Sequence, residues 1–86
     1  MRSICEEPTV EAIVDFALQK WKRLDDGWQA MKWALARDPD SGAVITGRLR
    51  GRTLPGAKSI GLPTITVVYE FDERTVTIID VEFNDA

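Results

Sequence analysis

The apolar positions in the first half of the chain follow the period of an α-helix. They recur three or four residues apart from Val10 to Leu35, and the members are Val10, Ile13, Val14, Ala17, Leu18, Trp21, Leu24, Trp28, Met31 and Leu35. Residues at this spacing lie on one face of a helix, so the stripe predicts helical structure packed against a core.

The pattern allows one continuous helix but favours two. A single helix over the whole stripe would be about 40 Å long, which exceeds the roughly 30 Å diameter of a small domain. Asp25-Asp26-Gly27 offers two capping acids and a residue that tolerates unusual dihedral angles. We therefore expect two antiparallel helices over residues 9–23 and 26–37, with Thr9 as the N-cap of the first.

In the second half, apolar residues alternate with polar ones, which is the period of a β-strand. Strands are predicted over residues 43–53, 64–71 and 75–83, with a short first strand within 2–7. Asp72-Glu73-Arg74 closes a hairpin, and Pro55-Gly56 suits the centre of a type II turn. Within residues 75–83, apolar residues occupy the even positions up to Ile78 and the odd positions from Ile79, so they change from one strand face to the other. The pattern therefore leaves the register of this hairpin open. The fold class expected is α+β: a single domain over 1–86, with a helical hairpin packed on a small antiparallel sheet.

Composition removes several classes of chemistry. The 86 residues include no histidine, which excludes Ser-His-Asp and Cys-His triads and removes the commonest zinc ligand. The lone Cys5 cannot form an internal disulfide, and we interpret it as a small packed side chain. We accordingly expect no metal, no cofactor and no catalytic residue.

No part of the chain has the composition of a membrane span or a signal peptide. The longest aliphatic runs are only a few residues, such as Ile65-Thr66-Val67-Val68, whereas a span needs about 20 apolar residues. Arg2, Glu6 and Glu7 stand where a signal peptide has its apolar segment. The expectation is a cytoplasmic protein without membrane contact.

The three tryptophans divide into two groups. Trp21 and Trp28 lie on the apolar stripe and are predicted to be core residues. Trp33 lies off the stripe, where it can cover a partner or the edge of the sheet.

Charge is strongly segregated along the chain. The net charge is −3, yet no acid occurs between Ser41 and Tyr69, and the bases of this segment are Arg48, Arg50, Arg52 and Lys58. Strand alternation would place the three arginines on one face, where their guanidinium groups suit phosphates or a partner's carboxylates. The alternative is a solvated face paired with the protein's own acids. These four residues are our candidate binding residues, and the overall acidity favours a partner's acidic segment over nucleic acid as the ligand.

One stretch carries a resemblance to a known family. Val67 to Val81 resembles the closing hairpin of the RelE/ParE toxin superfamily, with a β run ending in Tyr, a short acidic turn and a valine-rich strand. Leu49-Arg50-Gly51 is similar to the Leu-x-Gly sequence that begins the preceding strand in this family. Ala36-Arg37-Asp38-Pro39 is similar to the sequence at the C-terminal end of the family's second helix. The resemblance implies a bacterial growth-inhibiting toxin, part of a toxin–antitoxin system, that an antitoxin holds inactive. RelE-like members cleave messenger RNA on the ribosome, and ParE-like members poison DNA gyrase.

Two departures from the family's nuclease branch concern chemistry. Thr66 stands where that branch has an arginine, and Asn84-Asp85-Ala86 replaces its basic, aromatic tail. Cleavage by a neighbouring 2′-hydroxyl needs a proton acceptor, a proton donor and cations, and only the cations have candidates here. We therefore expect a toxin-like protein that acts by binding, with the ribosome or gyrase as its target. The alternatives are a ribosome-dependent messenger RNA endoribonuclease and a non-toxic interaction module or homodimer.

Overall fold

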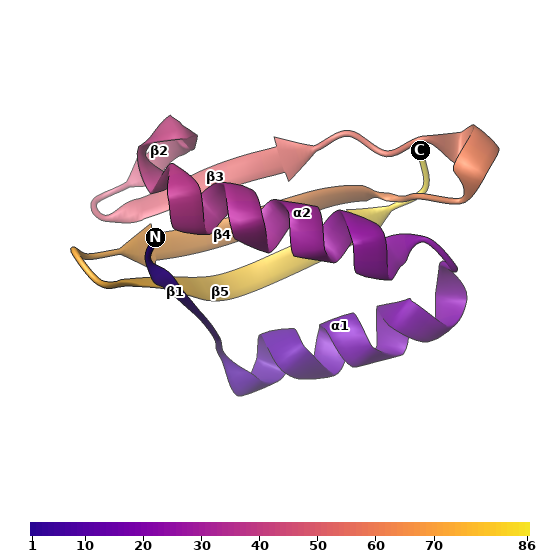
Figure 1. The fold of residues 1–86 in the computed structure, drawn as a ribbon, viewed down its shortest axis with the longest axis horizontal. Coiled ribbons are helices and arrows are strands. Elements are labelled where there is room, and N and C mark those ends of the chain that lie inside the picture. Colours follow the sequence, from indigo (N-terminus) through magenta and orange to yellow (C-terminus); the bar gives the residue numbers. More distant parts are fainter.

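The computed structural model describes residues 1–86 as a layer of helices on one face of a sheet (Figure 1). In chain order the elements are β1 (Ser3–Glu6), α1 (Pro8–Lys20), α2 (Leu24–Arg37), η1 (Pro39–Ser41), β2 (Ala43–Thr46), β3 (Leu49–Leu54), η2 (Lys58–Ile60), β4 (Thr64–Phe71) and β5 (Thr75–Asn84). The predicted α+β class and the helical hairpin are confirmed. No helix is both long enough and apolar enough to cross a bilayer.

The helix boundaries differ from those predicted. Glu7 rather than Thr9 is the N-cap of α1, because Pro8 already occupies the first helical position, where its missing N–H costs nothing. The break lies at Trp21–Arg23, and Asp25-Asp26-Gly27 belongs to the first turn of α2. Trp21 adopts an extended backbone and packs against Phe83, so a tertiary contact ends α1.

Gly27 is needed for packing rather than for a chain break. It is buried, and a Cβ atom there would lie only 3.2 Å from Cδ1 of Ile65 and closer still to Leu62. The small residue thus lets α2 approach β4 closely.

The five strands form one mixed sheet in the order β1-β5-β4-β3-β2. β1 pairs with β5 in parallel, with Ser3 opposite Thr75, and the other neighbours are antiparallel. The wholly antiparallel sheet was therefore a wrong prediction. The parallel pair arises because the helical hairpin carries the chain back to the starting end of β1 before the antiparallel strands begin (Figure 1).

The segment predicted as one strand over 43–53 is two. Gly47 has a φ of 54°, a left-handed conformation that glycine adopts without strain, and with Arg48 it turns the chain from β2 into β3. The predicted type II turn at Pro55-Gly56 is also wrong, because Gly56 lacks the positive φ that this turn requires. A Cβ on Gly56 would instead lie 2.6 Å from the backbone nitrogen of Thr64, so close backbone approach explains the glycine.

A β-bulge resolves the register that the sequence left open. Along the β4–β5 ladder Tyr69 pairs with Ile78 and the preceding residue, Val68, pairs with Asp80, which leaves Ile79 unpaired. The extra residue reverses the alternation of β5, so Ile78 before it and Val81 after it both point into the core.

The core lies between the helices and one face of the sheet. Its fully or almost fully buried members are Val10, Val14, Ala17, Leu24, Trp28, Met31, Leu35, Ile65, Val67, Tyr69, Val76, Ile78 and Val81. Trp28 is core, as predicted, whereas Trp21 is half-buried at its margin. Trp33 is 52% exposed, which agrees with its place off the apolar stripe.

Candidate interaction surface beside the second helix

A buried tyrosine organises the connection from α2 to β2. Tyr69, on β4, is completely buried, and its hydroxyl donates a hydrogen bond of 2.6 Å to the carbonyl oxygen of Pro39 in η1. Gly42 lies so close that a Cβ atom there would overlap the Tyr69 hydroxyl. The residue at position 42 must therefore be glycine for the phenol to reach its acceptor.

Arg50 and Arg52 support the same connection from β3. Arg50 lies opposite Tyr69 and Arg52 opposite Val67, so both project on the helix-covered face of the sheet. Nη1 of Arg50 donates to the carbonyl oxygens of Asp40 at 3.1 Å and Gly42 at 2.9 Å. These bonds hold the chain between α2 and β2 against β3.

Arg52 is hydrogen-bonded less completely than Arg50. Its Nη1 donates to Oγ of Ser41 at 2.6 Å, and the carbonyl oxygen of Asp38 lies at 3.5 Å. Because both arginines make internal bonds, a triple change of Arg48, Arg50 and Arg52 to glutamate is expected to loosen this connection.

The environment of Tyr69 shifts its acidity. Burial raises the pKa of the Tyr69 phenol above its ordinary value, because the charged phenolate is poorly solvated there. The backbone of Gly42 and the positive charges of Arg52 and Arg50 oppose this shift in pKa without cancelling it. The hydroxyl is thus a neutral hydrogen-bond donor around neutral pH.

This raised pKa predicts alkaline sensitivity. In the unfolded chain the phenol ionises near pH 10, whereas in the folded chain it keeps its proton to higher pH. Its contribution to stability is therefore full below about pH 10 and is lost as the pH rises through the folded value. The chain has one tyrosine, so phenolate absorbance reports this group alone. We expect the absorbance change to accompany unfolding, and Tyr69→Phe to flatten the alkaline loss of stability. A phenolate that appears near pH 10 in a folded chain would contradict this.

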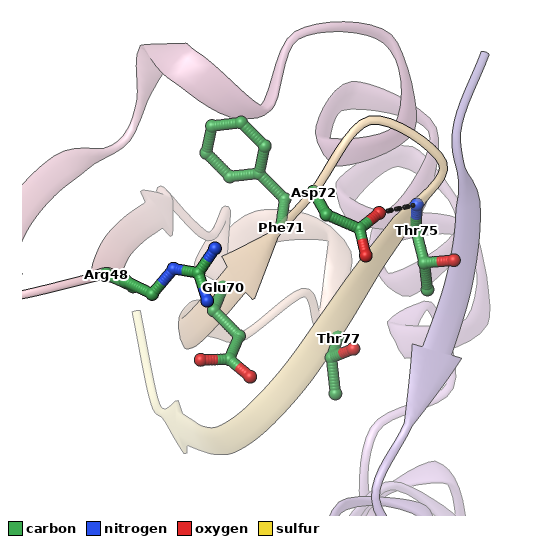
Figure 2. Close-up of a pocket in the computed structure, with 6 residues that line it drawn as sticks. All are labelled: Arg48, Glu70, Phe71, Asp72, Thr75 and Thr77. Atoms are coloured by element: carbon green, nitrogen blue, oxygen red, sulfur yellow. Dashed lines mark hydrogen bonds between the residues drawn. The ribbon is translucent and has the colours of Figure 1, made fainter.

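Arg48 does not belong to the arginine pair. It lies in the turn before β3 and lines a polar pocket of about 100 Å³ whose other residues are Glu70, Phe71, Asp72, Thr75 and Thr77 (Figure 2). Glu70 and Thr77 pair with each other one position away from buried Tyr69, so they lie on the sheet face that no helix covers. The predicted single row of three arginines is therefore wrong.

The pocket at Arg48 is lined by more negative than positive groups. Oδ1 of Asp72 accepts hydrogen bonds of 2.8 Å from the backbone N–H groups of Arg74 and Thr75, the second of which Figure 2 shows. These two bonds hold the pKa of Asp72 below its ordinary value. One guanidinium beside the carboxylates of Glu70 and Asp72 does not make an anion site.

Lys58 is also separated from the arginine pair. It opens η2 and lines a groove with Trp21, Gly61, Leu62, Asp85 and Ala86. Of the four sequence-predicted binding residues, the structure therefore brings together only Arg50 and Arg52.

A hollow between α2 and β3 combines cations with an exposed aromatic ring. The α2–β3 hollow, of about 290 Å³, is lined by Trp33, Ala34, Arg37, Asp38 and Arg52. The Cζ atom of Arg37 lies 4.9 Å from the centre of the Trp33 ring, within the range of a cation–π contact. Two arginines and one aspartate line the hollow, so it carries a positive balance.

The composition of the α2–β3 hollow is typical of a protein-binding surface. Tryptophan and arginine dominate binding energy at interfaces, and a guanidinium pairs with a carboxylate through two parallel hydrogen bonds.

No group of three His, Cys, Asp or Glu side chains is arranged to hold a metal ion.

The structure is a small two-layer α+β domain with a cationic, aromatic hollow beside its second helix. Comparisons with family models, with curated proteins and with solved structures find no match to this chain.

Sequence reasoning did not bring Trp33 and Arg37 together. Arg37 was assigned only to the C-terminal end of a helix, and Trp33 was expected to cover a partner or the edge of the sheet. Their spacing of four residues could have predicted that the two side chains are neighbours on one face of the helix. Their meeting with Arg52 depends on the packing of α2 beside β3, which the local pattern does not contain.

Proposed function

We propose that this chain is the toxin-like half of a toxin–antitoxin pair, and that it acts by protein binding without cleaving RNA. The α2–β3 hollow is the observation that carries the proposal. It presents Trp33, which is 52% exposed, with the guanidinium group of Arg37 against its ring and with Arg52 in the same lining. An acidic segment of a partner protein suits it, because carboxylates pair with the arginines while an apolar side chain packs on the ring.

The internal bonds of two residues support binding rather than cleavage. The chain's one phenol, Tyr69, is buried and donates to Pro39, and Arg50 donates to two carbonyl groups. The Tyr69 hydroxyl is therefore not free to contact a phosphate, and Nη1 of Arg50 is already occupied. In-line cleavage of RNA also needs a proton acceptor and a proton donor at the scissile bond, and there is no histidine to serve as either.

One residue favours the ribonuclease alternative. Asp38 lines the α2–β3 hollow together with Arg37 and Arg52, and a carboxylate can accept a proton from a 2′-hydroxyl. The two functions differ in what happens to messenger RNA, so one experiment separates them.

The test is induced expression of the chain in bacterial cells. We expect growth to stop while messenger RNA stays intact. The double change Trp33→Ala with Arg37→Glu should restore growth, because it removes the aromatic anchor and reverses one charge of the hollow. Lys22→Glu is the charge-matched control, since Lys22 is exposed and precedes α2 at its opposite end. This control should stop growth as the unaltered chain does.

The other outcomes point to the alternatives. Messenger RNA fragments that disappear with Asp38→Asn would identify a ribonuclease. Normal growth with folded, abundant protein would identify a non-toxic interaction module. Growth arrest that survives the double change would leave the toxin role standing and remove the α2–β3 hollow as its contact surface.

A further inference from the structure

One edge of the sheet is open to another strand. β2 is the outermost strand and has only β3 beside it, so along its free side alternate N–H and C=O groups lack a strand partner. All four of its residues, Ala43–Thr46, are exposed, and Val44 and Ile45 leave 62% and 54% of their surface in solvent. The strand contains no charge and no proline, two features that commonly block pairing at an edge, although it is only four residues long and its register with β3 shifts between Val44 and Thr46.

The opposite edge of the sheet is better protected. β1 carries Glu6, whose carboxylate lies 3.7 Å from the ammonium group of Lys32, and Glu7-Pro8 follows directly. Charge and proline near an edge discourage pairing with a further strand. β2 is therefore the edge suited to association.

The residues that flank β2 have opposite charges. Asp40 precedes the strand and Arg48 follows it, and both are exposed. When two identical strands pair antiparallel about a two-fold axis, the residue before one strand meets the residue after the other. Asp40 of each copy then faces Arg48 of the other, so the edge is complementary to itself in charge as well as in backbone hydrogen bonding.

We propose that two copies of this chain associate through an antiparallel pairing of their β2 strands. The two five-stranded sheets then continue into one, and the Val44 side chains of the two copies pack across the axis. Ile45 lies over β3, because its Cδ1 atom is 3.1 Å from where a Cβ on Gly51 would stand. This inference goes beyond the proposed function, since it uses the free edge of β2 rather than the α2–β3 hollow.

Sedimentation equilibrium of the full chain tests the proposal. We expect a concentration-dependent dimer, and Val44→Lys should raise its dissociation constant by about tenfold or more, because burying an ammonium group at the axis is unfavourable. Phe16→Lys is the matched control: Phe16 is 75% exposed on α1 and lies outside the pairing, so this variant should dimerise normally. A chain that stays monomeric at every concentration, or a dimer that Val44→Lys leaves unchanged, overturns the proposal.

Exchanging the flanking charges tests the antiparallel register itself. Asp40→Lys and Arg48→Asp should each weaken self-association by about tenfold, because each homodimer then opposes like charges at two places. Mixing the two variants should restore association, since the introduced lysine of one copy then faces the introduced aspartate of the other, and the remaining Asp40 faces the remaining Arg48. The substitution at position 40 leaves its backbone carbonyl, which Arg50 binds, unchanged. A mixture no tighter than the separate variants rules out this pairing.

Discussion

Replacing Trp28 with alanine is expected to lower the free energy of unfolding by about 3–5 kcal/mol. The Trp28 side chain is 2% exposed, and its ring meets that of Phe83 edge-on at 6.0 Å between centroids. The whole domain should be stable by roughly 4–13 kcal/mol at typical values per residue. Loss of this one ring therefore removes a large share of the total and brings the chain close to unfolding.

Trp33→Ala is the matched control for Trp28→Ala. Trp33 lies on the same helix but is half in solvent, so its loss should cost less than about 1 kcal/mol. Urea unfolding at one fixed protein concentration measures both changes. Equal losses for the two variants would show that Trp28 does not carry the contact between α2 and the sheet.

Gly42→Ala is expected to destabilise the fold by about 1–3 kcal/mol, because the added methyl group enters space already filled. Its carbon would overlap the Tyr69 hydroxyl and lie 2.9 Å from Cζ of the same ring. Tyr69→Phe should cost about 1–3 kcal/mol for a different reason: it leaves the buried carbonyl of Pro39 without its donor.

The two changes should not be additive. Once Tyr69→Phe has removed the hydroxyl, the methyl group of Gly42→Ala loses its nearest obstacle and should cost less than in the unaltered chain. A double-mutant cycle by urea unfolding measures this coupling. If Gly42→Ala costs the same in both backgrounds, contact with the hydroxyl is not the reason for the glycine.

The pattern of apolar residues predicted helices and strands correctly where buried residues recur at the regular spacing of a helix or a strand. The stripe through Leu24, Trp28, Met31 and Leu35 is the buried face of α2, and β4 has the predicted bounds, Thr64–Phe71. The pattern did not predict helix ends or strand pairings that depend on contacts between residues far apart in the chain. Packing of Trp21 on Phe83 ends α1 before the expected break, and the parallel pairing of β1 with β5 joins residues far apart in the chain.

The candidate site was predictable only in part. Alternation indicated that Arg50 and Arg52 share a face, and they do. Which face that is depends on the register between β3 and β4, which places Arg50 opposite buried Tyr69. Arg48 left the row because Gly47 turns the chain, with a positive φ that glycine adopts without strain.

The pairing of β1 with β5 has a consequence for the growing polypeptide. β5 lies between β1 and β4, so neither neighbour is complete until Thr75–Asn84 has been synthesised (Figure 1). Until then the apolar stripe of α1 and α2 lacks Val76 and Ile78, and β4 presents an unpaired edge. Exposed apolar surface and open strand edges promote aggregation and chaperone binding in nascent chains. Emergence of β5 is therefore the step that commits this chain to its fold.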